Sequence, residues 1–315
     1  MTAGPFARRS HAQLEVGQAI WVNTGGTVPR GADAVIASRN SMDLQKIQSC
    51  VVPGDNIEQQ GSDWKRGEVI VPAGTRVGAR EMALLFEAGV KRVAGWASPR
   101  VAVVATGSEI TQEADGLSSG FRRCSNASYI AALMSRIGVT DIRTIVVPDD
   151  IRQLTRTLVE LDAVCDAIIT VGGTGKGKRD YTRQAVSDAG GVFVGHDTQL
   201  DSPFVTARLP HAGLIGLPGN PLAVMMIVQC VLLESVRSVF HLPEAPAQTV
   251  EAVMTEDIEA GICGELCVNV NESAAKPLIK GTGRMRVFDS ARGFVRLNGQ
   301  GIKRGERVRV ELFRN

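Results

Sequence analysis

The sequence lacks any long basic run, and its formal net charge at pH 7 is only +2 over 315 residues. Nucleic-acid-binding proteins usually concentrate lysine and arginine on one face, so the composition gives no electrostatic indication of such a partner. Residues 1–16 contain no apolar h-region of a secretory signal peptide. No stretch approaches the ~20 apolar residues that cross a bilayer. These absences predict a cytoplasmic protein with no nucleic-acid or membrane partner.

Cysteine is scarce as well. The six cysteines are scattered, and only Cys263 and Cys267 lie close together in the sequence. No second pair and no histidine cluster completes a metal-ligand set around them. We therefore expect reduced, mostly buried thiols, as is usual in the cytosol.

Glycine is abundant, with 34 residues, and 44% of the chain is apolar. This composition supports a packed protein, and the length exceeds that of a typical single core. Short β-type runs broken by glycine and proline turns predict a β-rich domain over residues 1–75, with a tail to about 16. A helical linker is predicted over 76–98, because apolar residues recur at helical spacing in 79–90.

Residues 99–243 alternate continuous apolar strands with amphipathic helices. This alternation predicts βαβ units and a three-layer α/β domain with a mostly parallel sheet. One helix is expected to begin at an N-cap of Ser125 or Asn126 and to stop at Gly138. Residues 244–315 return to alternating apolar and polar residues, which predicts a C-terminal β domain.

Three glycine turns, ATGSE (105–109), VGGTG (171–175) and LPGNP (217–221), each follow a predicted buried strand. Ligands of parallel sheets bind outside the carboxyl ends of the strands. We therefore expect the three turns to meet around one cleft.

The second turn has neither the spacing of a dinucleotide fingerprint nor a Walker lysine. It offers unobstructed backbone N–H groups near a helix N-terminus, which suit a phosphate or carboxylate. Thr174 adds a hydroxyl, and Lys176, Lys178 and Arg179 add positive charge. Asp180 either caps the next helix or holds a metal ion or orients a substrate group.

Glu109, in the first turn, either caps a helix or ligates Mg²⁺, which prefers carboxylates and phosphate oxygens. In the third turn, Asn220 is expected to cap a helix that has Pro221 at its first position. That capping role leaves Asn220 able to contact a ligand as well.

The motifs ATGSEI, SNASYIAALMSRIG with VPDD, ITVGGTG with KRDYT, and GLPGNP occur in this order and resemble the molybdopterin-binding domain. VNTGGTVPRGADAVI, PGDNIEQQGSDWKRGEVIVPAGTRV and the closing β domain resemble MoeA-type molybdopterin molybdenumtransferases, the group that includes the gephyrin E domain. The resemblance runs from about residue 17 to the C-terminus. It implies a molybdopterin-binding α/β domain flanked by an N-terminal β-rich domain and a C-terminal β-barrel-like domain.

The family inserts molybdate into adenylylated molybdopterin (molybdopterin-AMP) with Mg²⁺ and releases AMP. The resemblance therefore implies these substrates, a homodimer, and contact with a molybdopterin adenylyltransferase or a molybdoenzyme acceptor. By position it implies catalytic roles for Asp180, Glu109 and Thr24, with Glu109 and Asp180 also holding the metal. The pterin- and phosphate-binding positions that it implies are Thr106, Gly107, Ser108, Gly172, Gly173, Thr174, Gly175, Lys178, Arg179, Pro218, Gly219 and Asn220.

The sequence also departs from the family pattern. The chain begins after the usual D-N-S-A-M-D-G-Y-A type motif, and residues 199–203 (QLDSP) replace the usual K-P-G-K-P run. Loss of two cations lowers the affinity of an anion site by several kcal/mol unless other charges replace them. Arg284, Arg286 and Arg292 stand where the family has serines, and they either replace the lost charge or bind another ligand.

Three functions are therefore open at this point. The first is molybdenum insertion, and the second is non-catalytic binding of molybdopterin or its cofactor by a carrier or scaffold. The third is adenylylation of molybdopterin, because GGTG-x-x-x-RD-x-T is similar to the loop of MogA-type adenylyltransferases.

Overall fold

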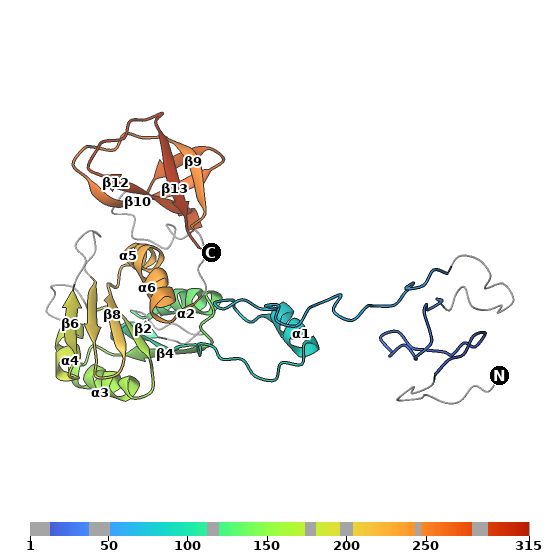
Figure 1. Cartoon of the computed structure of the whole chain (residues 1–315). Helices are drawn as coiled ribbons and strands as arrows, with labels where there is room; N and C mark the ends of the chain where they lie inside the picture. The colour runs from blue at the N-terminus through green and yellow to red at the C-terminus, as the bar shows by residue number, and fades with distance from the viewer. Residues whose placement is uncertain are drawn as a thin grey trace. The chain divides into compact units, whose positions relative to one another are not determined.

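A computed structural model describes residues 13–37, 51–111, 120–173, 181–195, 204–242, 247–278 and 289–314. The chain divides into two compact units. One comprises residues 1–73 and 77–91, and the other comprises 74–76 and 92–315. Figure 1 colours the chain from the N-terminus to the C-terminus.

The N-terminal unit contains helix α1 (Ala79–Glu87), as the apolar spacing predicted. The helix starts after Gly78, whose backbone N–H donates to Glu81 Oε2 at 3.0 Å. Elsewhere in the described part of this unit, extended runs alternate with turns, and Gln13 and Arg30 form an isolated parallel bridge. The β character of this unit thus lies in extended segments, and the predicted short runs do not pair as a ladder among its described residues.

The second unit contains a six-stranded sheet in the order β4-β1-β5-β8-β7-β6. Its strands are β1 (Arg100–Thr106), β4 (Asp141–Val147), β5 (Ala167–Val171), β6 (Val192–Gly195), β7 (Val205–Arg208) and β8 (Gly213–Leu217). The first four in sheet order are parallel, which confirms the mostly parallel α/β fold. The β6–β7 pair is antiparallel and was not predicted.

Helices cover both faces of this sheet (Figure 1). Side chains of β1 alternate between the two cores: Val101 and Val103 face one, and Ala102 and Val104 face the other. The first core is closed by α2 (Ser125–Arg136) and by the long helical stretch Pro221–Val239. The second is closed by α3 (Ile151–Asp162) and α4 (Thr182–Asp188). The result is three layers.

The two ends of α2 differ in how well local sequence signals predict them. The N-cap of α2 is Cys124 and not Ser125 or Asn126, and it makes no side-chain capping hydrogen bond. The start of α2 is fixed instead by β2 (Ile110–Thr111), which pairs with β3 (Arg122–Arg123) directly before the helix. Gly138 ends α2 with a φ of 105°, as predicted.

The stretch Pro221–Val239 consists of α5 (Pro221–Ile227), a π-helical turn (η3, Val228–Leu232) and α6 (Leu233–Val239). An 18-residue window within these 19 residues has a mean hydropathy of 1.8, so the expectation that no stretch approaches bilayer-spanning length was wrong. In the structure, 61% of its apolar window is buried within the protein. The hydropathy therefore reflects packing against the sheet on one side and the barrel on another.

The C-terminal strands close into a barrel in the order β10-β11-β9-β13-β12. They are β9 (Thr249–Met254), β10 (Cys263–Asn271), β11 (Ala274–Pro277), β12 (Gly293–Asn298) and β13 (Arg307–Leu312). Inward-facing apolar residues such as Met254, Val268 and Val310 fill it. The barrel-like expectation is confirmed, although β11 was not predicted as a strand.

Gln229 joins the barrel's C-terminal end to the α/β core. Its side chain is buried in the π-helical turn, and its Nε2 donates to Tyr129 Oη at 3.0 Å and to the Arg314 carbonyl at 3.1 Å. Its Oε1 accepts from the Arg314 N–H at 3.0 Å. A π-turn displaces one residue out of helical register. Here that residue, Gln229, makes hydrogen bonds with the backbone of Arg314 near the C-terminus.

We predict that Gln229→Ala lowers the free energy of unfolding by about 2 kcal/mol, because it removes a hydrogen bond to Tyr129 and both hydrogen bonds to the partly buried backbone of Arg314. Gln184→Ala is the matched control: its amide bonds an exposed carboxylate on α4, and its loss should cost only a few tenths of a kcal/mol. Urea unfolding of both variants measures the difference. Equal losses would show that the Gln229 bonds do not stabilise the junction.

Asp162, at the end of α3, holds the turn before β8. Its Oδ1 accepts from the N–H groups of His211 and Ala212 at 3.0 and 2.8 Å, and its Oδ2 lies 2.9 Å from His211 Nδ1. Burial would raise the pKa of Asp162, but the hydrogen bonds from the His211 ring and these N–H groups outweigh burial and lower it.

A lowered native pKa stabilises the fold above the pKa of an unfolded aspartate, about 4, and this stabilisation is lost as the pH falls through the native value. We therefore expect Asp162→Asn to be less stable than wild type by about 1–2 kcal/mol at pH 7, and the gap to close below pH ~3. Urea midpoints between pH 7 and 2.5 test this, with Asp188→Asn on α4 as control. A gap that is independent of pH would contradict the assignment.

Candidate functional site

Three parallel strands bring the glycine turns to one edge of the sheet. Ala105 of β1 aligns with Val171 of β5, and Val171 aligns with Leu217 of β8, so the turns that follow start level with one another. The Gly172 N–H donates to the Leu217 carbonyl at 2.9 Å, and Thr106 Oγ1 donates to the Val171 carbonyl at 3.3 Å. The expectation that the three turns meet is confirmed for their described residues.

The second turn packs too tightly for any side chain. Gly172 has a φ of 100°, and a Cβ built on it would lie 2.7 Å from Thr106 Oγ1 and 2.8 Å from the Thr106 carbonyl oxygen. Gly173 has a φ of 62°, and its Cβ would lie 2.7 Å from Thr182 Oγ1. Thr182 is fully buried and donates to the Gly172 carbonyl at 3.0 Å. Glycine is therefore required here for its conformation and for close approach.

In the first turn, Ser108 and Asp149 bond each other reciprocally. The Asp149 N–H donates to Ser108 Oγ at 3.1 Å, and the Ser108 N–H donates to Asp149 Oδ2 at 3.3 Å. Asp150, in contrast, caps α3 by accepting from the Gln153 N–H at 2.9 Å. The two aspartates are adjacent in the sequence, and only their different hydrogen-bond partners distinguish Asp149 as a candidate site residue.

A narrow hollow opens beside these turns. Its lining residues are Thr106, Pro148, Asp149, Asp150, Leu154, Gly173, Tyr181 and Thr182. Glu109 is exposed next to it, and its carboxylate folds over Gly107, where an added Cβ would lie 3.1 Å from Glu109 Oε2. Exposed and partly exposed carboxylates therefore flank the glycine turns.

The third turn is held by two asparagines. Asn220 Oδ1 caps α5 by accepting from the N–H groups of Leu222 and Ala223 at 2.9 and 3.3 Å, as predicted. Asn126 Nδ2, in the first turn of α2, donates to the Gly219 carbonyl at 3.0 Å. A Cβ on Gly219 would lie 3.9 Å from Gly172 Cα, so the second and third turns are in contact.

Several predicted site residues lie elsewhere. Thr174, Gly175, Lys176, Lys178, Arg179 and Asp180 lie outside the described residues. Thr24 belongs to the N-terminal unit, where it is exposed in a turn closed by the Gly26 N–H and the Asn23 carbonyl at 2.8 Å. Among the described residues, no three His, Cys, Asp or Glu side chains group as a metal site. The paired metal role of Glu109 and Asp180 thus remains a prediction.

The same segments match known protein families. Residues 3–89 match the "MoeA N-terminal region (domain I and II)", and residues 102–238 match the "Probable molybdopterin binding domain". The chain resembles MoeA-type proteins in both of these segments. The three turns lie in the segment that matches the probable molybdopterin binding domain.

Named relatives agree with this assignment. The chain is 30% identical to a molybdopterin molybdenumtransferase of Bacillus subtilis over 79% of its own length and 60% of the relative's. It is 27% identical to the molybdopterin molybdenumtransferase of Haemophilus influenzae, over 66% of its own length and 53% of the relative's. A crystal structure of the molybdopterin biosynthesis moea protein from Pyrococcus horikosii has the same fold, with a TM-score of 0.74 and 24% identity. The match covers 96% of this chain and 78% of that structure's chain. The chain thus spans about 60% or less of the length of these two molybdopterin molybdenumtransferases.

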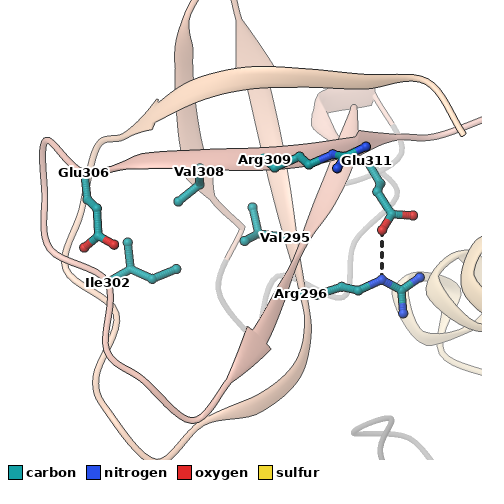
Figure 2. Close-up of a pocket in the computed structure, with 7 residues that line it drawn as sticks. All are labelled: Val295, Arg296, Ile302, Glu306, Val308, Arg309 and Glu311. Atoms are coloured by element: carbon teal, nitrogen blue, oxygen red, sulfur yellow. Dashed lines mark hydrogen bonds and ion pairs between the residues drawn. The ribbon is translucent and has the colours of Figure 1, made fainter.

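A second hollow lies in the barrel (Figure 2). Val295, Ile302 and Val308 form its apolar part. At its edge, Arg296 Nε donates to Glu311 Oε1 at 2.8 Å. That hydrogen bond raises the pKa of Arg296 and favours its charged form. This hollow offers an apolar surface beside a neutralised ion pair, whereas the turn edge offers backbone donors and carboxylates.

We predict that Gly172→Ala lowers the free energy of unfolding by about 3 kcal/mol, because a positive φ and a contact with Thr106 both oppose a Cβ. Gly213→Ala is the matched control, since Gly213 begins β8 and a Cβ there meets nothing within 4 Å. Urea unfolding compares the two. If Gly172→Ala were as stable as Gly213→Ala, the tight packing of the turns would be disproved.

Proposed function

We propose that this protein is a molybdenum insertase, which transfers molybdenum from molybdate to the dithiolene of adenylylated molybdopterin and releases AMP. The observation that carries the proposal is the convergence of the three glycine turns at one sheet edge, with carboxylates beside them. Its relatives are named for this transfer.

Each described group has a role in this proposal. The Gly173 N–H binds a phosphate oxygen, because no side chain obstructs the turn, whereas the Gly172 N–H is used by the Leu217 carbonyl. Glu109 and Asp149 supply hard oxygen ligands of the kind that Mg²⁺ prefers, so the donors fit this ion. When bound, Mg²⁺ neutralises phosphate oxygens. Ser108 orients Asp149 through their reciprocal hydrogen bonds.

The proposal extends to predicted residues outside the described segments. Lys178 and Arg179 add positive charge at the phosphate, and Asp180 is the second predicted metal ligand. The predicted catalytic role of Thr24, a residue of the N-terminal unit, is also part of the proposal. We also propose that the protein is a cytoplasmic homodimer, which sedimentation velocity at micromolar concentration tests. Its proposed protein partners are a molybdopterin adenylyltransferase or a molybdoenzyme acceptor.

Non-catalytic binding of molybdopterin or its cofactor is the second candidate. It is favoured by residues 199–203 (QLDSP), which carry no lysine where the family has two. Such a carrier would bind the pterin nucleotide without releasing AMP. Adenylyltransfer, suggested by GGTG-x-x-x-RD-x-T, would instead consume ATP and form the adenylylated pterin.

Reconstitution with molybdopterin-AMP, Mg²⁺ and molybdate is expected to release AMP. Asp149→Asn and Asp180→Asn should each lower the rate at least tenfold, about 1.4 kcal/mol, because each removes a negative ligand of a hard cation. Asp150→Asn is the control, since asparagine caps a helix as well as aspartate does. Each variant's urea midpoint should stay near that of wild type.

Tight binding without AMP release would exclude the insertase and support the carrier. Formation of the adenylylated pterin from ATP would support the adenylyltransferase. Unchanged rates in Asp180→Asn would leave Asp180 as a helix cap.

A further inference from the structure

Asn126, in the first turn of α2, contacts the third glycine turn directly. Its Nδ2 donates to the Gly219 carbonyl at 3.0 Å, across 93 residues of sequence. Its Oδ1 is buried and has no hydrogen-bond partner among the described residues. The opposite orientation of the amide would bring two oxygen acceptors together, so the bond to Gly219 determines how this side chain lies.

An unpaired acceptor inside a protein is costly, and native structures retain few of them. Asn126 therefore keeps its bond to Gly219 although its own oxygen stays without a donor in the part of the chain that the structure describes. This imbalance indicates that the bond serves the position of the third turn and not the satisfaction of Asn126.

The bond fixes the plane of the peptide between Gly219 and Asn220. No peptide bond of the described chain is cis, and in a trans peptide the C=O and the N–H point in opposite directions. Because the Gly219 carbonyl is turned toward Asn126 on α2, the Asn220 N–H is directed away from α2. That N–H has no acceptor among the described residues.

The side-chain oxygen of Asn220 is already in use. It accepts from the N–H groups of Leu222 and Ala223 and so caps α5. The hydrogen-bonding groups that Asn220 has left for a ligand are therefore donors, and its backbone N–H is the one that Asn126 orients. Donors of this kind bind anions.

The third turn also lies against the second. A Cβ on Gly219 would lie 3.9 Å from Gly172 Cα. Gly172 donates its N–H to the Leu217 carbonyl, which leaves the Gly173 N–H as the donor of the second turn. Two backbone donors, those of Gly173 and Asn220, thus belong to turns in contact. An oxyanion accepts several hydrogen bonds, so it is a suitable ligand for such a pair.

We propose that Asn126 is a positioning residue of the site, which orients the Asn220 N–H toward a tetrahedral oxyanion by holding the Gly219 carbonyl. This inference rests on the proposed function and adds a residue of α2 to it. Asn126 acts through one peptide and does not itself contact the oxyanion. The oxyanion is a phosphate of the pterin nucleotide or molybdate.

NMR titration of the nitrogen-15-labelled full chain with AMP, with inorganic phosphate and with molybdate tests this role. We expect the Asn220 amide resonance of wild type to shift on binding. Asn126→Ala should lose this shift and at least tenfold in affinity, about 1.4 kcal/mol. Shifts with AMP and phosphate alone assign the donor to the nucleotide, shifts with molybdate alone assign it to the metal oxyanion, and shifts with all three assign it to both.

Asn269→Ala is the matched control. Asn269 lies in β10 of the barrel, and its Nδ2 also donates to a backbone carbonyl, that of Ser290, at 2.6 Å. Both alanine variants lose one bond of the same type, so their urea midpoints should fall by similar amounts. Only Asn126→Ala should lose affinity for the oxyanion, which a purely structural role would not produce.

Asn126→Asp gives a second test. It replaces the donor by an oxygen that repels the Gly219 carbonyl, so it should bind the probes no better than Asn126→Ala does. Its added charge also repels an anion, but about 1 M salt reduces the screening length to about 3 Å. The deficit relative to wild type should therefore persist at high salt.

Wild-type affinity in folded Asn126→Ala would overturn the inference, as would an Asn220 resonance that stays unshifted when wild type is saturated with each probe. Absence of binding of all three probes by wild type would overturn it as well. AMP release in the reconstitution assay decides the proposed function separately. An active wild type with an unaffected Asn126→Ala variant refutes the positioning role alone, whereas oxyanion binding through Asn220 without AMP release refutes the insertase alone.

Discussion

The site depends on the close approach of two backbone turns at the carboxyl edge of the central strands. Gly172 lies against Thr106 with no space for a Cβ, and its own N–H is bonded to the end of β8. Three strands in register make this approach possible, and only glycine permits it. The ligand-facing amides can therefore keep a fixed position without any side chain to hold them.

The layers around this edge hold the strands in register. β1, β5 and β8 are buried on both faces by helices, so a shift of one strand would move apolar side chains from one core to the other. The helix that begins at Asn220 then extends from the site to the barrel, where Gln229 and the cluster around Met225 and Phe294 fix the C-terminal strands. The barrel is thereby joined to a helix whose first residue belongs to the third turn.

Backbone geometry determines where the charged residues lie around this edge of the sheet. Ser108 fixes Asp149 on one side, while a two-residue ladder places Arg122 and Arg123 on another. Acidic and basic groups therefore lie on different elements. Such an arrangement fits a substrate with phosphates and a divalent ion better than it fits a neutral ligand.

The sequence by itself determined the alternation of strands and helices, the three turns and the caps at Asp150 and Asn220. These features follow from local causes: apolar runs, positive-φ glycines and side chains that bond the next helical turn. Tertiary structure alone decided that Asp149 bonds Ser108, that Cys124 begins α2, that β6 and β7 pair antiparallel, and that the barrel closes through β11. Each of these depends on partners between about 10 and 40 residues away, whose approach no local pattern encodes.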